Sequence, residues 1–181
     1  YYRNEAYVDR HDVSFMPYDC YLGAGGETLG YLRKALEDRG SGVDLPAAVI
    51  VETVQAEGGV NVASPEWLRE LARLCQEFDI ILIVDDIQAG CGRTGFFFSF
   101  EEAEISPDMI LLSKSISGFG LPMSILLMKP ELDQWQPGEH SGTFRGNNLA
   151  FLTATVALRR FWQDDTFGAD VRRNGEVVRK R

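Results

Sequence analysis

Short apolar runs alternate along this chain with longer stretches in which apolar residues recur at helical spacing. Four of the runs have the length of β-strands, at residues 47–52, 80–84, 109–112 and 124–128. Strands that alternate with helices form mostly parallel sheets, because a crossover between parallel strands is usually a helix that covers one face. We therefore predict an α/β fold in which helices flank a mostly parallel sheet.

Helix signals separate the predicted strands. Residues 27–39 have helical spacing, and Ser64 and Pro65 suit the N-cap and the first position of a second helix. Asn147 or Asn148 can cap a last long helix. These boundaries support the alternating pattern.

Charge and cysteine content narrow the classes of function. The 181 residues include 18 Lys and Arg against 27 Asp and Glu, for a formal net charge of −9. Such acidity argues against nucleic acid or an anionic membrane as the main partner, and no apolar run reaches the roughly 20 residues of a membrane span. Cys20, Cys75 and Cys91 match no disulfide framework or zinc spacing. We therefore expect a cytoplasmic protein without a metal site.

Polar residues follow three of the predicted strands directly. Glu52, Asp85 and the pair Ser113 and Lys114 each come at the end of an apolar run. In parallel sheets the carboxyl ends of the strands meet at one edge, where ligands collect. The sequence therefore predicts a shared pocket at this edge.

The pairing of Asp85 with Lys114 suggests a specific chemistry. A lysine amine can form a Schiff base with an aldehyde, and a carboxylate can hold the proton of a pyridinium ring. Small residues beside Lys114 leave room for such a ring, and desolvation would lower the lysine pKa. The pattern indicates pyridoxal 5'-phosphate as the cofactor. Two simpler readings stay open: Lys114 is merely exposed, and Asp85 is an N-cap or pairs with Arg93.

Three further residues suit the same pocket. Gln88 could donate a hydrogen bond to a phenolic oxygen, and Glu57 stands in a glycine-containing loop that could face the same crevice. Thr143 offers a hydroxyl group and backbone amides before a helix, which suits a phosphate, although ordinary helix capping would explain it equally well.

Four blocks in order resemble the class III, or omega, pyridoxal phosphate-dependent aminotransferases. They read ETVQAEGG at residues 52–59, DDIQAGCGRTG at 85–95, SKSISGFGLP at 113–122 and GTFRGN at 142–147. The resemblance spans nearly the whole chain. It implies the central part of the large domain of a fold type I aminotransferase, with residues 1–163 in that domain and residues 164–181 starting the link to a C-terminal small domain.

The resemblance also implies a role for each site residue. Lys114 should form the Schiff base and later move the proton between the substrate and the cofactor. Asp85 should pair with the pyridine nitrogen, Ile87 should pack on one face of the ring, and Gln88 should bond the phenolic oxygen. Thr143 should reach the cofactor phosphate of a neighbouring subunit, which implies a homodimer or a higher homo-oligomer.

Two acidic positions carry further implications. Glu57 matches the glutamate that, in relatives, gates an arginine used for the 2-oxoglutarate carboxylate. Family members more commonly carry a glutamate directly after the aspartate that corresponds to Asp85. This chain has Asp86 there, which keeps the negative charge.

Within the family, the residues of these four blocks are most similar to those of the branch that serves ectoine biosynthesis. That branch moves the amino group of L-glutamate to L-aspartate 4-semialdehyde in a ping-pong reaction, giving L-2,4-diaminobutyrate and 2-oxoglutarate. The alternatives are an omega aminotransferase acting on 4-aminobutyrate, ornithine or acetylornithine, or an inactive fragment without the remaining cofactor-binding parts. Dinucleotide binding through the glycines of residues 23–26 is disfavoured, because no strand precedes them and the third glycine of the fingerprint is missing.

Overall fold

The computed structural model describes residues 13–23, 27–143 and 145–180. Backbone contacts divide the chain into two units, Tyr1–Pro46 and Ala47–Arg181. The first contains helix α1 (Thr28–Glu37), whose buried face includes Leu32 and Ala35. Of the glycine loop at residues 23–26, positions 24–26 lie outside the described residues.

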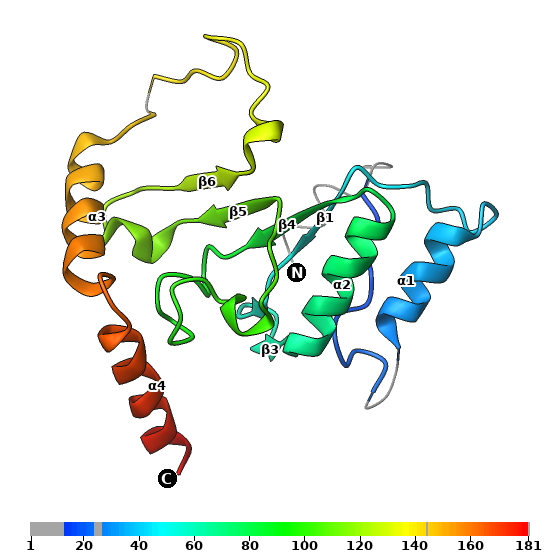
Figure 1. The fold of residues 1–181 in the computed structure, drawn as a ribbon, viewed down its shortest axis with the longest axis horizontal. Coiled ribbons are helices and arrows are strands. Elements are labelled where there is room, and N and C mark those ends of the chain that lie inside the picture. Colours follow the sequence, from blue (N-terminus) through cyan, green and yellow to red (C-terminus); the bar gives the residue numbers. More distant parts are fainter. Residues whose placement is uncertain (1–12, 24–26, 144, 181) are drawn as a thin grey trace. The chain divides into compact units, whose positions relative to one another are not determined.

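A four-stranded sheet organises the second unit. Its strands are β1 (Ala48–Val51), β4 (Ile81–Asp85), β5 (Met109–Leu112) and β6 (Ile125–Met128), side by side in that order (Figure 1). The pairs β1–β4 and β4–β5 are parallel, whereas β6 runs antiparallel to β5. The predicted mostly parallel α/β sheet is therefore confirmed, and each of its strands lies in one of the expected apolar runs.

The register places the carboxyl ends of three strands at one edge. Val51 pairs with Val84, and Asp85 pairs with Leu111. Glu52 follows Val51 directly, so its backbone lies beside that of Asp85. Val84 is fully buried, which anchors β4 immediately before its final residue.

Helix α2 (Pro65–Glu77) packs against this sheet through contacts with β4. The Ser64 hydroxyl accepts a hydrogen bond from the Trp67 N–H at 3.3 Å, which satisfies one of the unpaired donors at the helix start. Leu68, Leu71 and Leu74 are almost fully buried along one face. The predicted cap and apolar stripe of this helix are confirmed.

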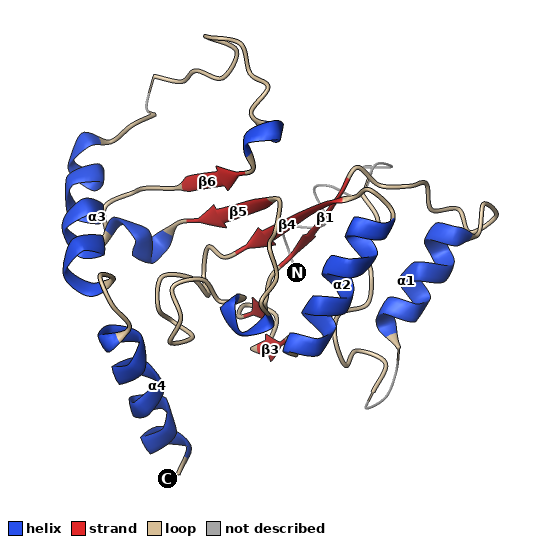
Figure 2. Cartoon of the chain, viewed as in Figure 1, coloured by secondary structure: helices blue, strands red, loops and turns tan. Residues whose placement is uncertain are grey.

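Helices α3 (Asn148–Phe161) and α4 (Thr166–Arg179) end the described chain (Figure 2). The Asn147 side chain accepts from the N–H groups of Leu149 and Ala150, so Asn147 is the cap of α3. Helix α3 contacts the 3-10 turn η3 (Lys114–Ser117). The domain boundary expected at residues 163 and 164 stays a prediction.

A small hairpin was not expected from the sequence. Strands β2 (Val54–Gln55) and β3 (Asn61–Val62) pair antiparallel within a stretch that reads as a glycine loop. Gly59, with φ of +113°, allows the turn between them. Two-residue strands are too short to show alternation, so only the glycine pair marked the turn. Two further 3-10 turns, η2 (Glu101–Ala103) and η4 (Pro130–Leu132), lie before β5 and after β6.

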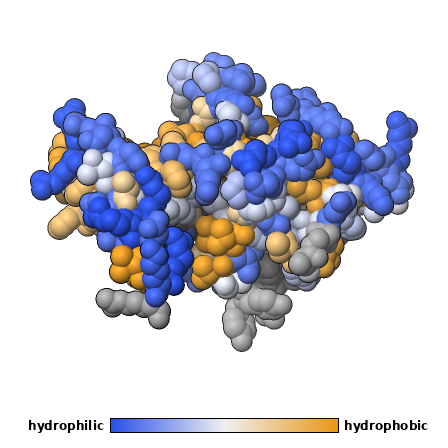
Figure 3. Space-filling view, turned by 60° about the horizontal axis from the view of Figure 1, so that its bottom comes forward, coloured by the Kyte–Doolittle hydropathy of each residue, from blue (hydrophilic) through white to orange (hydrophobic). Residues whose placement is uncertain are grey.

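Several large apolar side chains lie on the surface. Helix α3 exposes Leu149, Leu152 and Val156, and Figure 3 shows orange apolar patches between hydrophilic atoms on one face. Among the helices in the described part of the chain, none combines the length and hydropathy that crossing a bilayer requires.

Candidate active site

Lys114 opens the turn η3 just beyond the carboxyl end of β5. Its backbone is left-handed, with φ of +49°, a conformation that a residue with a side chain seldom adopts. The preceding Ser113 donates its hydroxyl to the Met123 carbonyl at 2.7 Å, which fixes the start of the turn. The Lys114 side chain is exposed, and its amine donates a hydrogen bond to the Gln88 side-chain carbonyl.

Gln88 links Lys114 to a third segment. Its Nε2 donates to Glu57 Oε1 at 3.3 Å. Glu57 comes from the connection between β2 and β3, and Gln88 from the loop that follows β4. The structure thus brings Glu57, Gln88 and Lys114 into one hydrogen-bonded series, although they are far apart in sequence.

Asp85 is the last residue of β4 and is half-buried. Its Oδ1 accepts from the Ile87 N–H at 3.1 Å, a local bond that holds the carboxylate above the turn. No ion pair joins Asp85 to Arg93 within the described residues, because the Arg93 Nε donates to the Ser115 hydroxyl at 3.3 Å instead. Neither simpler reading of Asp85 is present in the described residues. The pairing with Arg93 is absent, and the Asp85 side chain bonds within a turn, since no helix begins between β4 and η2.

Glu52 lies in the electrostatic field of the same residues. Burial raises the pKa of Glu52, and the charges of Asp85 and Glu57 raise it further, while the Lys114 ammonium opposes them. Such mutual influence requires proximity. The carboxylates of Glu52, Asp85 and Glu57 and the Lys114 amine therefore lie near one another. The sequence predicts Glu52 at this edge of the sheet without assigning it a role.

A cavity of about 690 Å³ opens beside Lys114. It is lined by Arg93, Ser113–Ser115 and the loop of residues 118–123, with no carboxylate among the lining residues. Asp85, Gln88 and Glu57 are not part of this lining. Thr143 is exposed in the connection between β6 and α3 and likewise does not line it. Within the described chain, no hydrogen bond joins Thr143 to the series of Lys114, Gln88 and Glu57.

A buried network lies behind Asp85. The next residue, Asp86, is 1% exposed. Its Oδ1 accepts from the Ser99 hydroxyl and its Oδ2 from the Ser99 N–H at 3.1 Å, while the Ser99 hydroxyl also contacts the Thr53 hydroxyl. Burial raises the pKa of Asp86, and the two bonds from Ser99 counteract this. This network cannot be predicted from the sequence, because nothing in the sequence distinguishes a buried aspartate from an exposed one.

The glycine loop at residues 90–95 is packed against the end of the chain. A Cβ at Gly92 would lie 2.7 Å from the Trp162 ring, and one at Gly95 would meet the Arg172 side chain. Arg172, on α4, donates to the Gly95 carbonyl and stacks over the Phe96 ring at 4.8 Å. The loop after Asp85 is thereby fixed to the last helix.

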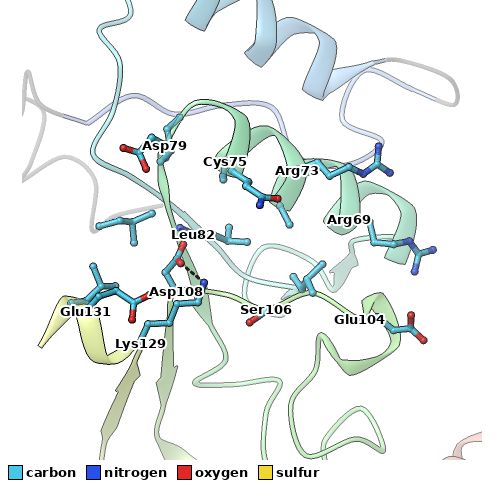
Figure 4. Close-up of a pocket in the computed structure, with 16 residues that line it drawn as sticks. Arg69, Arg73, Cys75, Asp79, Leu82, Glu104, Ser106, Asp108, Lys129 and Glu131 are labelled. Atoms are coloured by element: carbon cyan, nitrogen blue, oxygen red, sulfur yellow. Dashed lines mark hydrogen bonds and ion pairs between the residues drawn. The ribbon is translucent and has the colours of Figure 1, made fainter.

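A second cavity, of about 610 Å³, lies at the opposite edge of the sheet. Figure 4 shows Asp108 and Lys129 pointing toward one another there, at 2.7 Å, with Arg69 and Arg73 of α2 along the rim. These arginines already pair with Glu66 and Glu70. No predicted site residue lies in this cavity.

Comparison with known proteins gives a consistent assignment. The profile of the family "Aminotransferase class-III" matches residues 11–181. A diaminobutyrate–2-oxoglutarate transaminase from Bordetella parapertussis is 61% identical over 178 residues, covering 98% of this chain and 41% of the relative. The enzyme of the same name from Halomonas elongata is 60% identical over 174 residues, covering 96% and 41%. The chain thus spans about two fifths of the length of these curated relatives.

Solved structures agree with the sequence comparisons. The ornithine delta-aminotransferase of Plasmodium falciparum superposes with a TM-score of 0.64 at 36% identity, covering 72% of this chain and 33% of that one. N-acetylornithine aminotransferase from Stenotrophomonas maltophilia gives the same TM-score and identity over 75% and 34%. The chain belongs to the class-III aminotransferases.

Proposed function

We propose that the protein containing this chain is a pyridoxal phosphate-dependent aminotransferase whose covalent attachment point is Lys114. One observation carries the proposal most directly: an amine, an amide and a carboxylate from three separate segments meet in the series Lys114, Gln88 and Glu57. Asp85 ends the strand next to the one that precedes Lys114.

The donor set fits the chemistry of this cofactor. The Lys114 amine suits an aldehyde, the Asp85 carboxylate suits a protonated ring nitrogen, and the Gln88 amide suits a phenolic oxygen. When bound, pyridoxal phosphate supplies an electron-withdrawing ring that stabilises negative charge on the substrate carbon. The open cavity beside Lys114 leaves its amine accessible.

Each candidate residue of this chain would have a separate role in the reaction. Asp85, whose carboxylate accepts from the Ile87 N–H, would hold a proton on the ring nitrogen. Ile87 would provide an apolar contact for the ring. The Lys114 amine would take and return a proton at the substrate carbon, and Gln88, which accepts from that amine here, would bond the phenolic oxygen.

For substrates, we propose L-glutamate and L-aspartate 4-semialdehyde, giving L-2,4-diaminobutyrate and 2-oxoglutarate in a ping-pong reaction. The support is that diaminobutyrate–2-oxoglutarate transaminases are about 60% identical to this chain across nearly its whole length. Solved ornithine aminotransferases are less similar, at 34% to 40% identity. A role in ectoine biosynthesis stays a prediction, and Glu57 is the proposed residue near the dicarboxylate.

The remaining site proposal concerns assembly and location. Because Thr143 is exposed and does not line the Lys114 cavity, it is available to a neighbouring subunit, where we propose that it contacts the cofactor phosphate. Activity would then require a homodimer or a higher homo-oligomer. Three free cysteines support a reducing, cytoplasmic location.

Covalent trapping tests the cofactor assignment. Full-length protein is incubated with pyridoxal phosphate, reduced with borohydride and digested, and the modified peptide is located by mass spectrometry. We expect the label on Lys114 and its loss in Lys114→Ala. Lys129→Ala is the matched control, because its ion pair lies at the opposite edge of the sheet. A normal label in Lys114→Ala would contradict the proposal.

Initial rates test the substrates. Full-length enzyme is assayed with L-glutamate as donor and with aspartate 4-semialdehyde or glutamate 5-semialdehyde, the aldehyde that corresponds to ornithine, as acceptor. We expect the higher kcat/KM with the four-carbon acceptor. The reverse preference would assign the enzyme to the ornithine group.

A further inference from the structure

The proposed function assigns no role to the buried aspartate that follows Asp85. Asp86 is 1% exposed, and an unpaired charge at such a depth is costly. Both of its carboxylate oxygens are occupied by Ser99, one by the hydroxyl and one by the backbone N–H. A fully bonded buried carboxylate of this kind fixes the backbone that carries it.

The backbone of Asp86 is fixed as well. Its N–H donates to the Leu111 carbonyl at 3.0 Å, which continues the pairing of β4 with β5 by one residue. Its carbonyl accepts from the Gly90 N–H at 3.0 Å. A methyl group at Gly90 would lie 2.7 Å from both the carbonyl and the Oδ2 of Asp86, so only glycine fits here. Side chain and main chain of residue 86 are therefore both held.

The same network reaches the neighbouring strand end. The Ser99 hydroxyl contacts Thr53, which is 2% exposed and follows Glu52 directly. The Thr53 carbonyl accepts from the Ala63 N–H at 2.9 Å. Asp86 and Thr53 thus follow Asp85 and Glu52 directly, just past the ends of β4 and β1. Burial alternates along the end of β4, since Val84 and Asp86 are buried and Asp85 between them is half-buried, so Asp86 faces the buried side.

We propose that Asp86, through Ser99 and Thr53, is the positioning residue that holds the Asp85 carboxylate in place for the ring nitrogen of the cofactor. This inference rests on the proposed function. Asp86 itself touches neither cofactor nor substrate. It acts from the buried side of the strand end, while Asp85 presents its carboxylate on the other side.

A double-mutant cycle in the full-length protein tests the proposal. The variants are Asp86→Asn, Asp85→Asn and the combination, and the readouts are the dissociation constant for pyridoxal phosphate and the absorption maximum of the bound form. Because misplacing a group by about 1 Å can cost roughly a hundredfold, we expect Asp86→Asn to weaken cofactor binding at least roughly tenfold. We also expect it to shift the absorption in the direction seen for Asp85→Asn.

The combination separates positioning from general destabilisation. If Asp86 acts through Asp85, adding Asp86→Asn to Asp85→Asn should weaken binding only by roughly twofold or less. Fully additive losses, or an unchanged absorption maximum in Asp86→Asn, would overturn the proposal. Asp133→Asn, at an exposed aspartate outside the site, is the matched control and should bind as the parent protein does.

A milder variant covers the case in which Asp86→Asn does not fold. Ser99→Ala keeps the carboxylate and the backbone bond and removes only the hydroxyl. We expect the same spectral shift and a smaller loss of affinity, and parent-like values for both would equally overturn the proposal. If the parent protein acquired no label at Lys114, the proposed function would fail, which is a result distinct from any of these.

Discussion

At the scale of single residues, the candidate site residue Lys114 has an unusual backbone conformation that its neighbours must hold in place. It has a left-handed backbone, which in a residue with a side chain costs on the order of 1 kcal/mol or more and persists only when neighbours hold it. The Ser113 bond to Met123 and the packing of η3 on α3 provide that support. A conformation so constrained suits a side chain whose direction matters.

Thiol reactivity gives a test at the same scale. Burial raises the pKa of Cys75 and of Cys91 to about 11, with a smaller contribution from Asp108 and Asp86 respectively. At about pH 8 only a thousandth or so of such a thiol is ionised, and the thiolate is the reacting form. We expect iodoacetamide to spare both cysteines in the native protein at that pH and to modify them in urea, as followed by peptide mass spectrometry. Rapid labelling of native Cys75 would contradict this burial.

Sequence patterns identified the residues at strand ends but not those behind them. Asp85 and Lys114 stand directly after apolar runs, so topology alone brings them to one edge of the sheet. The link from Gln88 to Glu57 needs the hairpin β2–β3, whose strands are too short to predict. Ser99 and Thr53 are 46 residues apart, and only the folded chain shows that both approach Asp86.

At the scale of elements, the helix caps are the clearest sequence-encoded features. Ser64 was identified from its place before Pro65, and the structure shows the expected bond to Trp67. The last helix, α4, has no side-chain hydrogen bond at its N-cap, Asp165. Its start was therefore much harder to predict from the sequence.

The cap of α2 can be tested by substitution. We expect Ser64→Ala to lower the free energy of unfolding by about 1 kcal/mol, because a backbone N–H at the helix start loses its partner. Ser64→Asp, which retains an acceptor, should stay close to the parent protein. Urea denaturation followed by circular dichroism measures both, and equal losses in the two variants would show that the cap bond is unimportant.

Two glycines near Lys114 form a matched pair. Gly118 and Gly120 have similar φ values of +72° and +78°, but a Cβ at Gly118 would lie 2.5 Å from the Ala157 Cβ on α3, whereas one at Gly120 would meet nothing within 4 Å. Both alanine variants carry the backbone strain, and only Gly118→Ala adds an overpacking cost of about 1–3 kcal/mol. Thermal unfolding should therefore show the larger loss for Gly118→Ala. Equal losses would mean that helix α3 moves away from the added methyl group without an energetic cost.

At the scale of the whole sheet, one ion pair ties three strands together at the edge away from Lys114. Asp108 accepts from Lys129, which follows β6, at 2.7 Å and from the Leu82 N–H of β4 at 2.8 Å. Burial alone would raise the pKa of Asp108, but these bonds outweigh burial and hold the pKa below its ordinary value. Asp108 therefore stabilises the sheet in its ionised form.

The sign of the pH dependence follows from this lowered pKa. The contribution is complete above the unfolded-state pKa of about 3.9 and is lost as the pH falls through the lower folded-state value. We expect Asp108→Asn to cost about 1 kcal/mol near pH 7, since both partners are partly solvated, and the difference from the parent to shrink toward about pH 2. Urea denaturation across this range checks it. A difference that stays constant with pH would rule out the ionised carboxylate as its cause.

The contact of α4 with the glycine loop has an evolutionary consequence. Gly92 and Gly95 have positive φ values, and Trp162, Phe167 and Arg172 also fill the space that a side chain at either position would need. Natural variants that carry another residue at 92 or 95 should therefore also carry a smaller one at 162, 167 or 172. The loop and the terminal helix would then diverge together through paired substitutions.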